Sequence, residues 1–461
     1  MSVDTTAAPT TTADAPHART VLTIGSLGFF LMTLDISIVN VSLPDITRDL
    51  GGGTTGQQWT IDGYTLVFAS LLISAGSLAD RIGAKRALGL GVAMFTVASA
   101  GCAFAPGIGM LIAARCLQGV GAAVMLPASM ALIREAYPDP RRRARALSVW
   151  AVGGAVAALI GQPLGGLLTT IDWRWVFIIN LPVGIGMALF LCTVARSPQR
   201  PVPFDWPGQV LAIVALASLI FGLIEGGHLG YANPAVVGTL TAAVLALAAF
   251  LIVQARVAHP MMPLTLFSSA SFRISLSVGF AFMVGNYANV FTTSLFLQQD
   301  LGLSPLHTGL MYVPAGVFAI IGNLASGRIT NRFSPRIPIL TGQLAMVAGL
   351  AALLVTVQLR SPLLVALCII PIGGGGALAM PPVTGVVLNG IEPDRAGTAS
   401  AVYNTFRQVG GAVAIAVFGS LLATSANFLD GMRTSLIIAA ALLLVTAAIS
   451  LGIRTAPAAR S

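Results

Sequence analysis

The sequence has little charge, and lysine is almost missing from it. Only 9% of the 461 residues are charged, against roughly 25% in an average soluble domain, and Lys85 is the only lysine. Hydrophobic residues make up 56% of the chain, and the mean hydropathy is +0.87. A soluble fold of this size could not bury so much apolar surface. The composition therefore predicts an integral membrane protein.

Residue types that bind metals or perform catalysis are also scarce. The four cysteines lie in apolar stretches without a CxxC pair, and the four histidines are scattered singly, which argues against a disulfide framework or a metal site. The glycine run at 373–376 lacks the GK[ST] of a Walker loop, and the GVGAA string at 119–123 follows no strand. The sequence thus predicts no metal, no cofactor and no ATP-driven step, and it disfavours a membrane-embedded enzyme.

Fourteen apolar runs have roughly the length that an α-helix needs to cross a bilayer, so the predicted fold class is all-α. A Thr/Ala/Pro-rich segment at residues 1–19 precedes the first run and is predicted to be a disordered tail without a signal peptide. The predicted spans cover residues 21–43, 59–79, 87–106, 108–133, 146–168, 175–195, 208–226, 234–255, 274–297, 308–327, 337–358, 363–388, 398–423 and 435–453.

The distribution of cations predicts the orientation. With fourteen spans, nineteen of the 25 Lys and Arg residues fall on the side of the two termini, four fall on the other side, and Arg115 and Arg407 lie inside spans. Cytoplasmic loops carry the excess of positive charge in membrane proteins. Both termini are therefore expected in the cytoplasm. The net charge of +9 reflects this topology and contact with lipid headgroups, and the prediction includes no nucleic-acid partner.

Short strings along the whole chain carry a family resemblance. GSLADRIGAKR at 76–86 resembles the loop between helices two and three of the major facilitator superfamily. Other strings resemble motifs of the drug:proton antiporter branch with fourteen spans, and WTIDGYTLVFASLL at 59–72 is similar to antibiotic-resistance exporters of the methylenomycin type. The further matching strings are LDISIVNVSLP at 34–44, RCLQGVGAA at 115–123, WRWVFIINLPVG at 173–184, DWPGQVL at 205–211, LQQDLGLSPLHTG at 297–309 and AGTASAVYNTFRQVGG at 396–411.

The resemblance implies two six-helix bundles with two extra central helices between them. We expect the N-terminal bundle at 20–200, the extra helices at 201–258 and the C-terminal bundle at 259–455, with a cytoplasmic tail at 456–461. The apolar connection at 256–273 is expected to lie at the membrane interface.

The motif of the fifth span departs from the family pattern. The antiporter motif usually reads GPxxGG, whereas this chain has GQPLGG at 161–166. A proline displaced by one residue turns the kink by about 100° around the helix. The small residues remain, so close packing against a neighbouring helix is expected at Gly161, Pro163, Gly165 and Gly166.

Two acids, Asp35 and Asp62, are predicted to lie well inside apolar segments. Counted from the predicted span ends, Asp35 lies about 12 Å, Arg115 about 10 Å and Asp62 about 5 Å from the outer surface. An unpaired carboxylate in hydrocarbon is costly, so it faces a cavity, pairs or takes up a proton. The three residues are predicted to serve proton coupling or substrate binding. The alternative is a structural Asp35–Arg115 ion pair beside an interfacial Asp62.

The C-terminal half offers a second set of polar residues. Arg407 lies in the middle of the thirteenth span without a buried acid in its own half, so its partner is expected from water, substrate or the other half. Asn40, Asn404 and Gln408 are further candidates for the site. Side chains expected to line a cavity are those of Tyr64, Asn286, Tyr287, Asn289 and Phe291.

The charged turn after the second span is predicted to act as a conformational latch. The resemblance implies that it holds the two halves together on the cytoplasmic side in one state. Arg328, Arg332 and Arg336 occupy the equivalent turn of the C-terminal half, and the alternative is an ordinary set of topological charges. The predicted latch residues are Gly76, Asp80, Arg81, Gly83 and Arg86.

The predicted function is proton-coupled export of hydrophobic drugs or antibiotics by alternating access. The expected partners are a hydrophobic small molecule, protons and membrane lipids, and the protein is expected to be a monomer in the bacterial inner membrane. An exporter of an endogenous metabolite or of a biosynthetic-cluster product is the alternative within transport. A transporter-like sensor is disfavoured because no soluble domain is appended.

Overall fold

A computed structural model describes residues 17–199, 203–389, 391–392 and 395–453, and within these ranges the chain is helical and has no strand. Fourteen helical segments are long and apolar enough to cross a membrane, which confirms the predicted number of spans. The helices of the first six spans are α1 (Ala18–Leu50), α2 (Gly53–Ile82), α3 (Ala84–Ala103), α4 (Ile108–Ala136), α5 (Pro140–Ile171), α6 (Trp175–Ile178) and α7 (Asn180–Cys192). The helices of the remaining spans are α8 (Trp206–Leu229), α9 (Pro234–Arg256), α10 (Ala270–Leu295), α11 (Pro305–Met311), α12 (Val313–Arg332), α13 (Arg336–Thr356), α14 (Pro362–Leu388), α15 (Ala396–Thr424) and α16 (Phe428–Ser450).

Two spans that the sequence predicts as single helices are interrupted. The sixth consists of α6 and α7, and the tenth consists of α11 and α12. Each break lies just before a proline, Pro182 or Pro314, whose ring cannot continue the hydrogen bonding of the preceding turn. Shorter helical turns also follow α10, at Phe296–Asp300, and occupy the connection before α10, at Leu264–Ser268.

Several helices begin or end beyond the predicted spans. Helix α1 begins at Ala18, so the last residues of the predicted tail 1–19 are helical, while residues 1–16 lie outside the described part. The predicted tail at 456–461 also lies outside it. Helix α2 begins at Gly53, six residues before the predicted span. This difference places Asp62 farther along its helix than the predicted span did.

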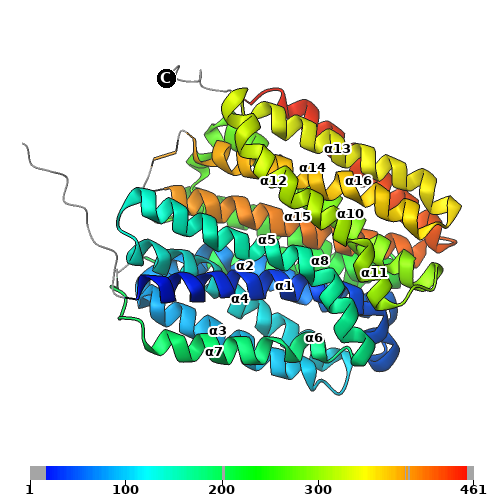
Figure 1. Ribbon diagram of the computed structural model, residues 1–461, viewed down its shortest axis with the longest axis horizontal. Helices are drawn as coiled ribbons and strands as arrows, with labels where there is room; N and C mark the ends of the chain where they lie inside the picture. The colour runs from blue at the N-terminus through cyan, green and yellow to red at the C-terminus, as the bar shows by residue number, and fades with distance from the viewer. Residues whose placement is uncertain (1–16, 200–202, 390, 393–394, 454–461) are drawn as a thin grey trace, which may run out of the picture.

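The helices run nearly parallel to one another and form one bundle (Figure 1). Helices α13, α14 and α16 lie at one side of the bundle and α3 and α7 at the other. Helix α2 packs against α15, and α5 packs against α11, so helices from the two ends of the sequence meet at a central seam. Helix α8 packs against both α2 and α15, and α9 packs on α8. The extra hairpin therefore covers one edge of the seam.

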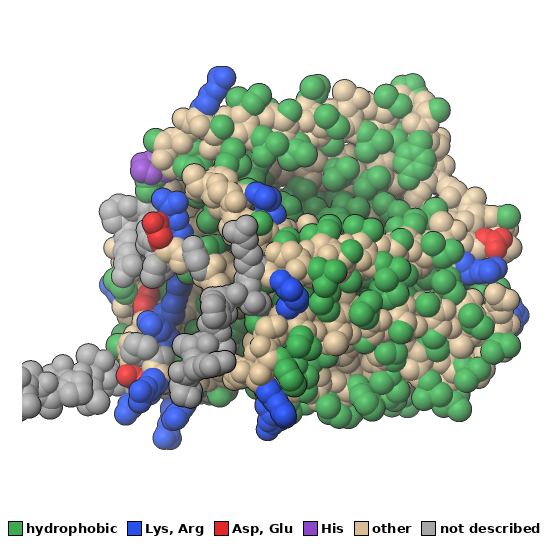
Figure 2. All heavy atoms as spheres, turned by 90° about the horizontal axis from the view of Figure 1, so that it is seen from above, with side chains coloured by type: hydrophobic (Ala, Val, Ile, Leu, Met, Phe, Trp, Pro, Cys, Tyr) green, Lys and Arg blue, Asp and Glu red, His purple; other side chains and the backbone are tan. Residues whose placement is uncertain are grey.

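The two ends of the bundle differ in charge. We call the end where α1 begins the terminal end, and the end carrying the α1–α2 turn the opposite end. In Figure 2 most of the visible Lys and Arg side chains gather at the terminal end, on the left, and hydrophobic side chains cover much of the surface between the ends. This pattern matches a protein whose sides face lipid.

Three hydrogen bonds that join the two halves lie toward the opposite end. Gln58 Nε2 of α2 donates to the carbonyl oxygens of Ile415 (3.2 Å) and Ala416 (2.8 Å) in α15. Gln298 Nε2 donates to the Val41 carbonyl oxygen at 2.9 Å, joining the end of α10 to α1. Nearer the middle, Thr405 Oγ1 donates to the Ala69 carbonyl oxygen at 3.4 Å. These contacts fix how α2 and α15 lie against each other.

Candidate substrate and ion-coupling site

Asp35 of α1 and Arg115 of α4 form a buried ion pair, through Arg115 Nη1 and Asp35 Oδ2. Both side chains are almost inaccessible to solvent, at 0% and 1% exposed. Arg115 also donates from Nη1 to Gln118 Oε1 (2.8 Å) and from Nε to the Thr60 carbonyl oxygen (3.0 Å). The Tyr64 ring lies 4.6 Å from the guanidinium carbon. The predicted pairing of Asp35 with Arg115 is thus present, and the pair joins α1, α2 and α4.

Two residues that the sequence analysis missed complete the coordination of Asp35. Asn180 Nδ2 and Gln118 Nε2 donate to Asp35 Oδ1 at 2.9 and 3.3 Å. Both amides also donate to Ser99 Oγ of α3, at 3.3 and 2.7 Å. The signal for Gln118 was its position three residues after Arg115, on the same helix face. Asn180 begins α7 directly after the break in the sixth span, which points its side chain into the bundle.

Asp62 of α2 lies in a different environment. It is fully buried, and neither carboxylate oxygen has a hydrogen-bond partner among the described residues. Because α2 begins at Gly53, Asp62 lies nine residues, or about 14 Å, along the helix from its start. The predicted span placed Asp62 only three or four residues from its start, so its position along the helix differs from that expectation.

Arg407 of α15 is a second poorly satisfied group. Its Nε is buried without a partner, its Nη1 makes a long contact of 3.4 Å with Asn404 Oδ1, and its Nη2 lies 4.0 Å from Met283 Sδ. The rings of Phe282 and Tyr403 lie 5.6 and 5.8 Å from its guanidinium carbon. No carboxylate of the described residues is within ion-pair distance.

The other predicted polar candidates are placed as follows. Asn40 is buried, its Nδ2 donates to the Ile36 carbonyl oxygen at 2.7 Å, and its Oδ1 has no partner among the described residues. Asn404 Nδ2 donates to the Ser400 carbonyl oxygen at 3.0 Å, and Gln408 is half-buried. Of the residues expected in a cavity, Tyr64, Tyr287, Asn289 and Phe291 are buried and Asn286 is half-buried.

The turn between α2 and α3 contacts its own half of the chain. Gly83, with φ of 89°, ends α2, and the Lys85 backbone N–H donates to Ser197 Oγ at 3.0 Å. Lys85 Nζ donates to the Val194 carbonyl oxygen. A cavity of about 270 Å³ lies at this turn and is lined by Ile82, Gly83, Lys85, Arg86, Arg196, Ser197 and Gln199. Asp80, Arg81 and Arg86 are exposed, and the described residues include no ion pair that joins Asp80 to the other half.

The GQPLGG segment of α5 packs closely on two neighbours. A Cβ at Gly161 would lie 2.4 Å from Ser37 Cβ, and one at Gly165 would lie 2.7 Å from the Ile38 carbonyl oxygen, so α1 approaches the backbone of α5. A Cβ at Gly166 would lie 2.4 Å from the Pro305 carbonyl oxygen of α11. Pro163 lies inside α5. The expected close packing is present on the α1 side and extends across the seam.

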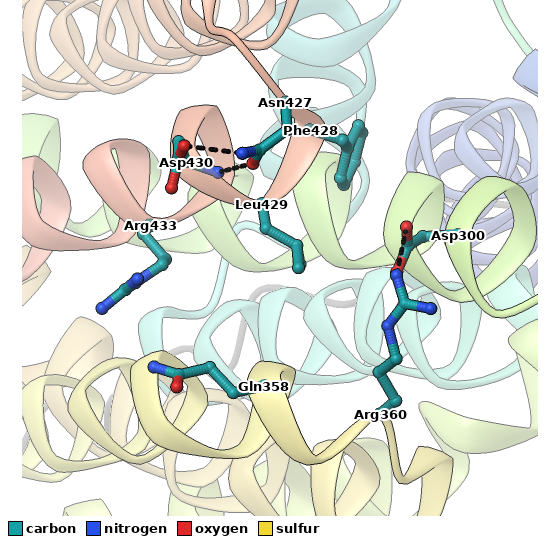
Figure 3. A pocket seen from close by; sticks show the side chains of 8 residues that line it. All are labelled: Asp300, Gln358, Arg360, Asn427, Phe428, Leu429, Asp430 and Arg433. Atoms are coloured by element: carbon teal, nitrogen blue, oxygen red, sulfur yellow. Dashed lines mark hydrogen bonds and ion pairs between the residues drawn. The ribbon is translucent and has the colours of Figure 1, made fainter.

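A surface pocket at the opposite end is separate from these groups (Figure 3). It has a volume of about 270 Å³, and one ion pair and one amide–carboxylate hydrogen bond form part of its lining. Arg360 Nη2 lies 3.1 Å from Asp300 Oδ1, and Asn427 Nδ2 donates to Asp430 Oδ2 at 2.7 Å. The lining residues are Asp300, Gln358, Arg360, Asn427, Phe428, Leu429, Asp430 and Arg433. Because its acids are engaged with neighbours, the buried groups at the seam are the stronger candidate site.

Among the described residues, fourteen helical segments that are long and apolar enough to cross a membrane surround a seam that holds buried charges, which is the arrangement of a multi-pass membrane protein. Residues 25–415 match the Major Facilitator Superfamily, and the chain belongs to this family, which makes it a transporter and not an enzyme. Its fold is similar to a crystal structure of a D-xylose-proton symporter, with a TM-score of 0.71 over 95% of this chain and 98% of that one, at 14% identity.

Relatives with assigned names are resistance and efflux proteins. The multidrug resistance protein Stp of Mycobacterium tuberculosis is 36% identical over 400 residues, which cover 86% of this chain and 74% of that protein. A methylenomycin A resistance protein of Streptomyces coelicolor is 36% identical over 90% of this chain and 88% of its own length. The drug efflux pump JefA of Mycobacterium tuberculosis is 34% identical over 88% of this chain and 81% of its own length.

Proposed function

We propose that this transporter exports hydrophobic small molecules, including antibiotics, in exchange for protons. The names of the relatives support drug export. The observation that carries the coupling mechanism is Asp62, a buried carboxylate at the seam between the halves that has no hydrogen-bond partner among the described residues. Such a group inside a membrane protein needs a proton, a cation or water.

The proposed exchange depends on exclusive occupancy of Asp62. In the inward-facing state a substrate displaces the proton, and in the outward-facing state a proton from outside displaces the substrate. An inward proton releases about 2.3 kcal/mol per 100 mV of membrane potential. Asp35 is less suited to bind the coupling proton, because Arg115, Asn180 and Gln118 already donate to its oxygens. We assign the Asp35–Arg115 pair to holding α1, α2 and α4 together as the halves move.

The topology belongs to the same proposal. The terminal end, which carries most of the cations, faces the cytoplasm of a bacterial cell, and the bundles at 20–200 and 259–455 move against each other as a monomer in the inner membrane. The contacts of Gln58 and Gln298 across the seam would then lie on the outer side of the membrane and close it. A transporter that is closed on its outer side is in an inward-facing state. In this state the turn around Asp80 forms no ion pair with the described residues of the C-terminal half. The contact by which this turn holds the two halves together on the cytoplasmic side would form when the transporter faces outward.

The test combines cells with purified protein. An efflux-deficient bacterial host expressing the chain should tolerate several hydrophobic antibiotics better than the empty host. In proteoliposomes, substrate addition should release protons from the wild type. Asp62→Asn should lose this exchange, whereas Glu392→Gln, a matched change of an exposed acid in a connection, should keep it. Undiminished antiport by Asp62→Asn would overturn the coupling assignment.

A further inference from the structure

Two opposite charges that have no ion-pair partner among the described residues face the seam from different halves, Asp62 from α2 and Arg407 from α15. We propose that the favoured substrates are amphoteric molecules, with an apolar ring system that carries an amine at one end and a carboxylate at the other. The amine pairs with Asp62 and the carboxylate with Arg407. This inference rests on the proposed function and specifies its substrate class.

Helix α10 connects the two charges. Arg407 lies against Gly279, whose added Cβ would be 2.9 Å from Arg407 Cγ, and its guanidinium reaches Met283. Tyr287, one turn further along the same face, packs on Gly411 of α15, whose added Cβ would lie 2.7 Å from Tyr287 Cε2. Gly411 lies at the level of Asp62, because Gln58 meets residues 415 and 416 in antiparallel register. Four residues of an α-helix rise about 6 Å, so the levels of the two groups differ by about one turn of α10.

The packing of α2 on α15 gives the same separation. Gln58 meets residues 415 and 416, and Thr405 meets Ala69, in antiparallel register. Asp62 therefore lies at the level of residues 411–412. Arg407 lies four to five residues nearer the terminal end, which corresponds to about 7 Å. Side chains tilt toward the N-terminus of their helix, and the N-termini of α2 and α15 lie at opposite ends of the bundle, so the two charged groups lie farther apart than these levels. A molecule whose charges are at the two ends of a ring system matches this arrangement.

The surroundings of Arg407 fit a carboxylate. A guanidinium has five N–H donors in a planar fork that matches a carboxylate. Two weak acceptors, Asn404 Oδ1 at 3.4 Å and Met283 Sδ at 4.0 Å, occupy only part of this fork. The rings of Phe282 and Tyr403 supply apolar surface beside it. A carboxylate bound here would satisfy donors that the protein leaves free.

Electrostatics favours a substrate with both charges over a substrate with one. An acid without an amine would bind Arg407, but its negative charge would favour the proton on Asp62 and would oppose exchange. An amine without an acid would displace the proton but would leave Arg407 unpaired. An amphoteric molecule displaces the proton and satisfies both groups. Because such a substrate is electrically neutral, the membrane potential acts fully on the proton.

Equilibrium dialysis of the purified full chain at pH 8 tests this assignment. The probes are norfloxacin, which has a carboxylate and a piperazine amine, its methyl ester, which keeps only the amine, and its N-acetyl derivative, which keeps only the acid. The wild type should bind norfloxacin at least about tenfold more tightly than either derivative, since a hydrogen bond to a charged group contributes about 1.5–3 kcal/mol. Equal binding of all three probes would overturn the proposal without any variant.

Variants separate this proposal from the proposed function. Arg407→Gln should weaken norfloxacin binding about tenfold and leave ester binding within about twofold, and Arg407→Lys should lie between. Arg433→Gln, a matched change in the separate surface pocket, should have no effect. Equal loss of both probes in a folded Arg407→Gln protein would overturn the carboxylate subsite. Proton release on ester binding to the wild type would still support exchange at Asp62, whereas its absence with every probe would reject the proposed function.

Discussion

Asp35 and Asp62 are both fully buried aspartates in neighbouring helices of the first half, yet their surroundings differ in kind. Asp35 accepts from Arg115, Asn180 and Gln118, so both of its oxygens are occupied. Asp62 accepts from no described residue. A proton added to Asp35 would displace a donor, whereas a proton added to Asp62 would satisfy an isolated charge. Burial alone therefore does not distinguish a candidate for proton coupling from a structural carboxylate, whereas the hydrogen-bond partners of the carboxylate do.

The largest effect on stability is expected at Arg115. Arg115→Ala leaves the Asp35 carboxylate buried without its cation, which costs about 3–5 kcal/mol of unfolding free energy. Thermal unfolding and yield in detergent measure this loss. The double change with Asp35→Asn should recover part of it, because no uncompensated charge remains. Strict additivity of the two single changes would mean that the pair does not act as a unit.

A smaller effect is expected at Asn180. Asn180→Ala removes one donor from Asp35 Oδ1 and should cost about 1–2 kcal/mol. Asn40→Ala is the matched control, because the amide of Asn40 donates to a carbonyl group within its own helix. If both changes lower the unfolding temperature equally, Asn180 does not contribute through Asp35.

The smallest effect on stability is expected at Asp62, although its effect on transport should be the largest. Asp62→Asn removes a buried carboxylate that none of the described residues compensates, so the unfolding temperature should stay the same or rise. Thermal unfolding of the purified variant at neutral pH measures this. A marked fall in the unfolding temperature would show that Asp62 has a structural partner, and the contrast with Asp35 would then disappear.

The sequence alone predicted the architecture and one ion pair of the candidate site. Hydrophobic run lengths predicted fourteen spans, and the depths of two motifs predicted Asp35 with Arg115. The start of α2 was expected at residue 59, whereas the polar segment 53–58 continues the helix beyond the apolar run, and Asp62 lies farther along its helix than expected. Hydropathy marks the apolar run and not the end of the helix, and Gln58 in this segment packs on α15.

Several of the residues that contact the buried charges could not be predicted from the sequence, because they come from other helices. Asn180 is 145 residues from Asp35 along the chain, and only the packing of α7 against α1 brings them together. Arg407 was recognised as unusual, but its neighbours Met283 and Phe282 come from another helix. Periodicity reports which face of a helix is buried and does not report which helix covers it.

The most direct test of the account is the protonation state of Asp62 during substrate binding. Substrate-induced difference infrared spectroscopy of the purified protein at neutral pH should show loss of a protonated carboxyl band, together with release of a proton into a weakly buffered solution. Both signals should vanish in Asp62→Asn, while a substrate still binds. If Asp62→Asn kept the carboxyl band and released the same number of protons, the coupling proton would lie on another group and the central claim would be contradicted.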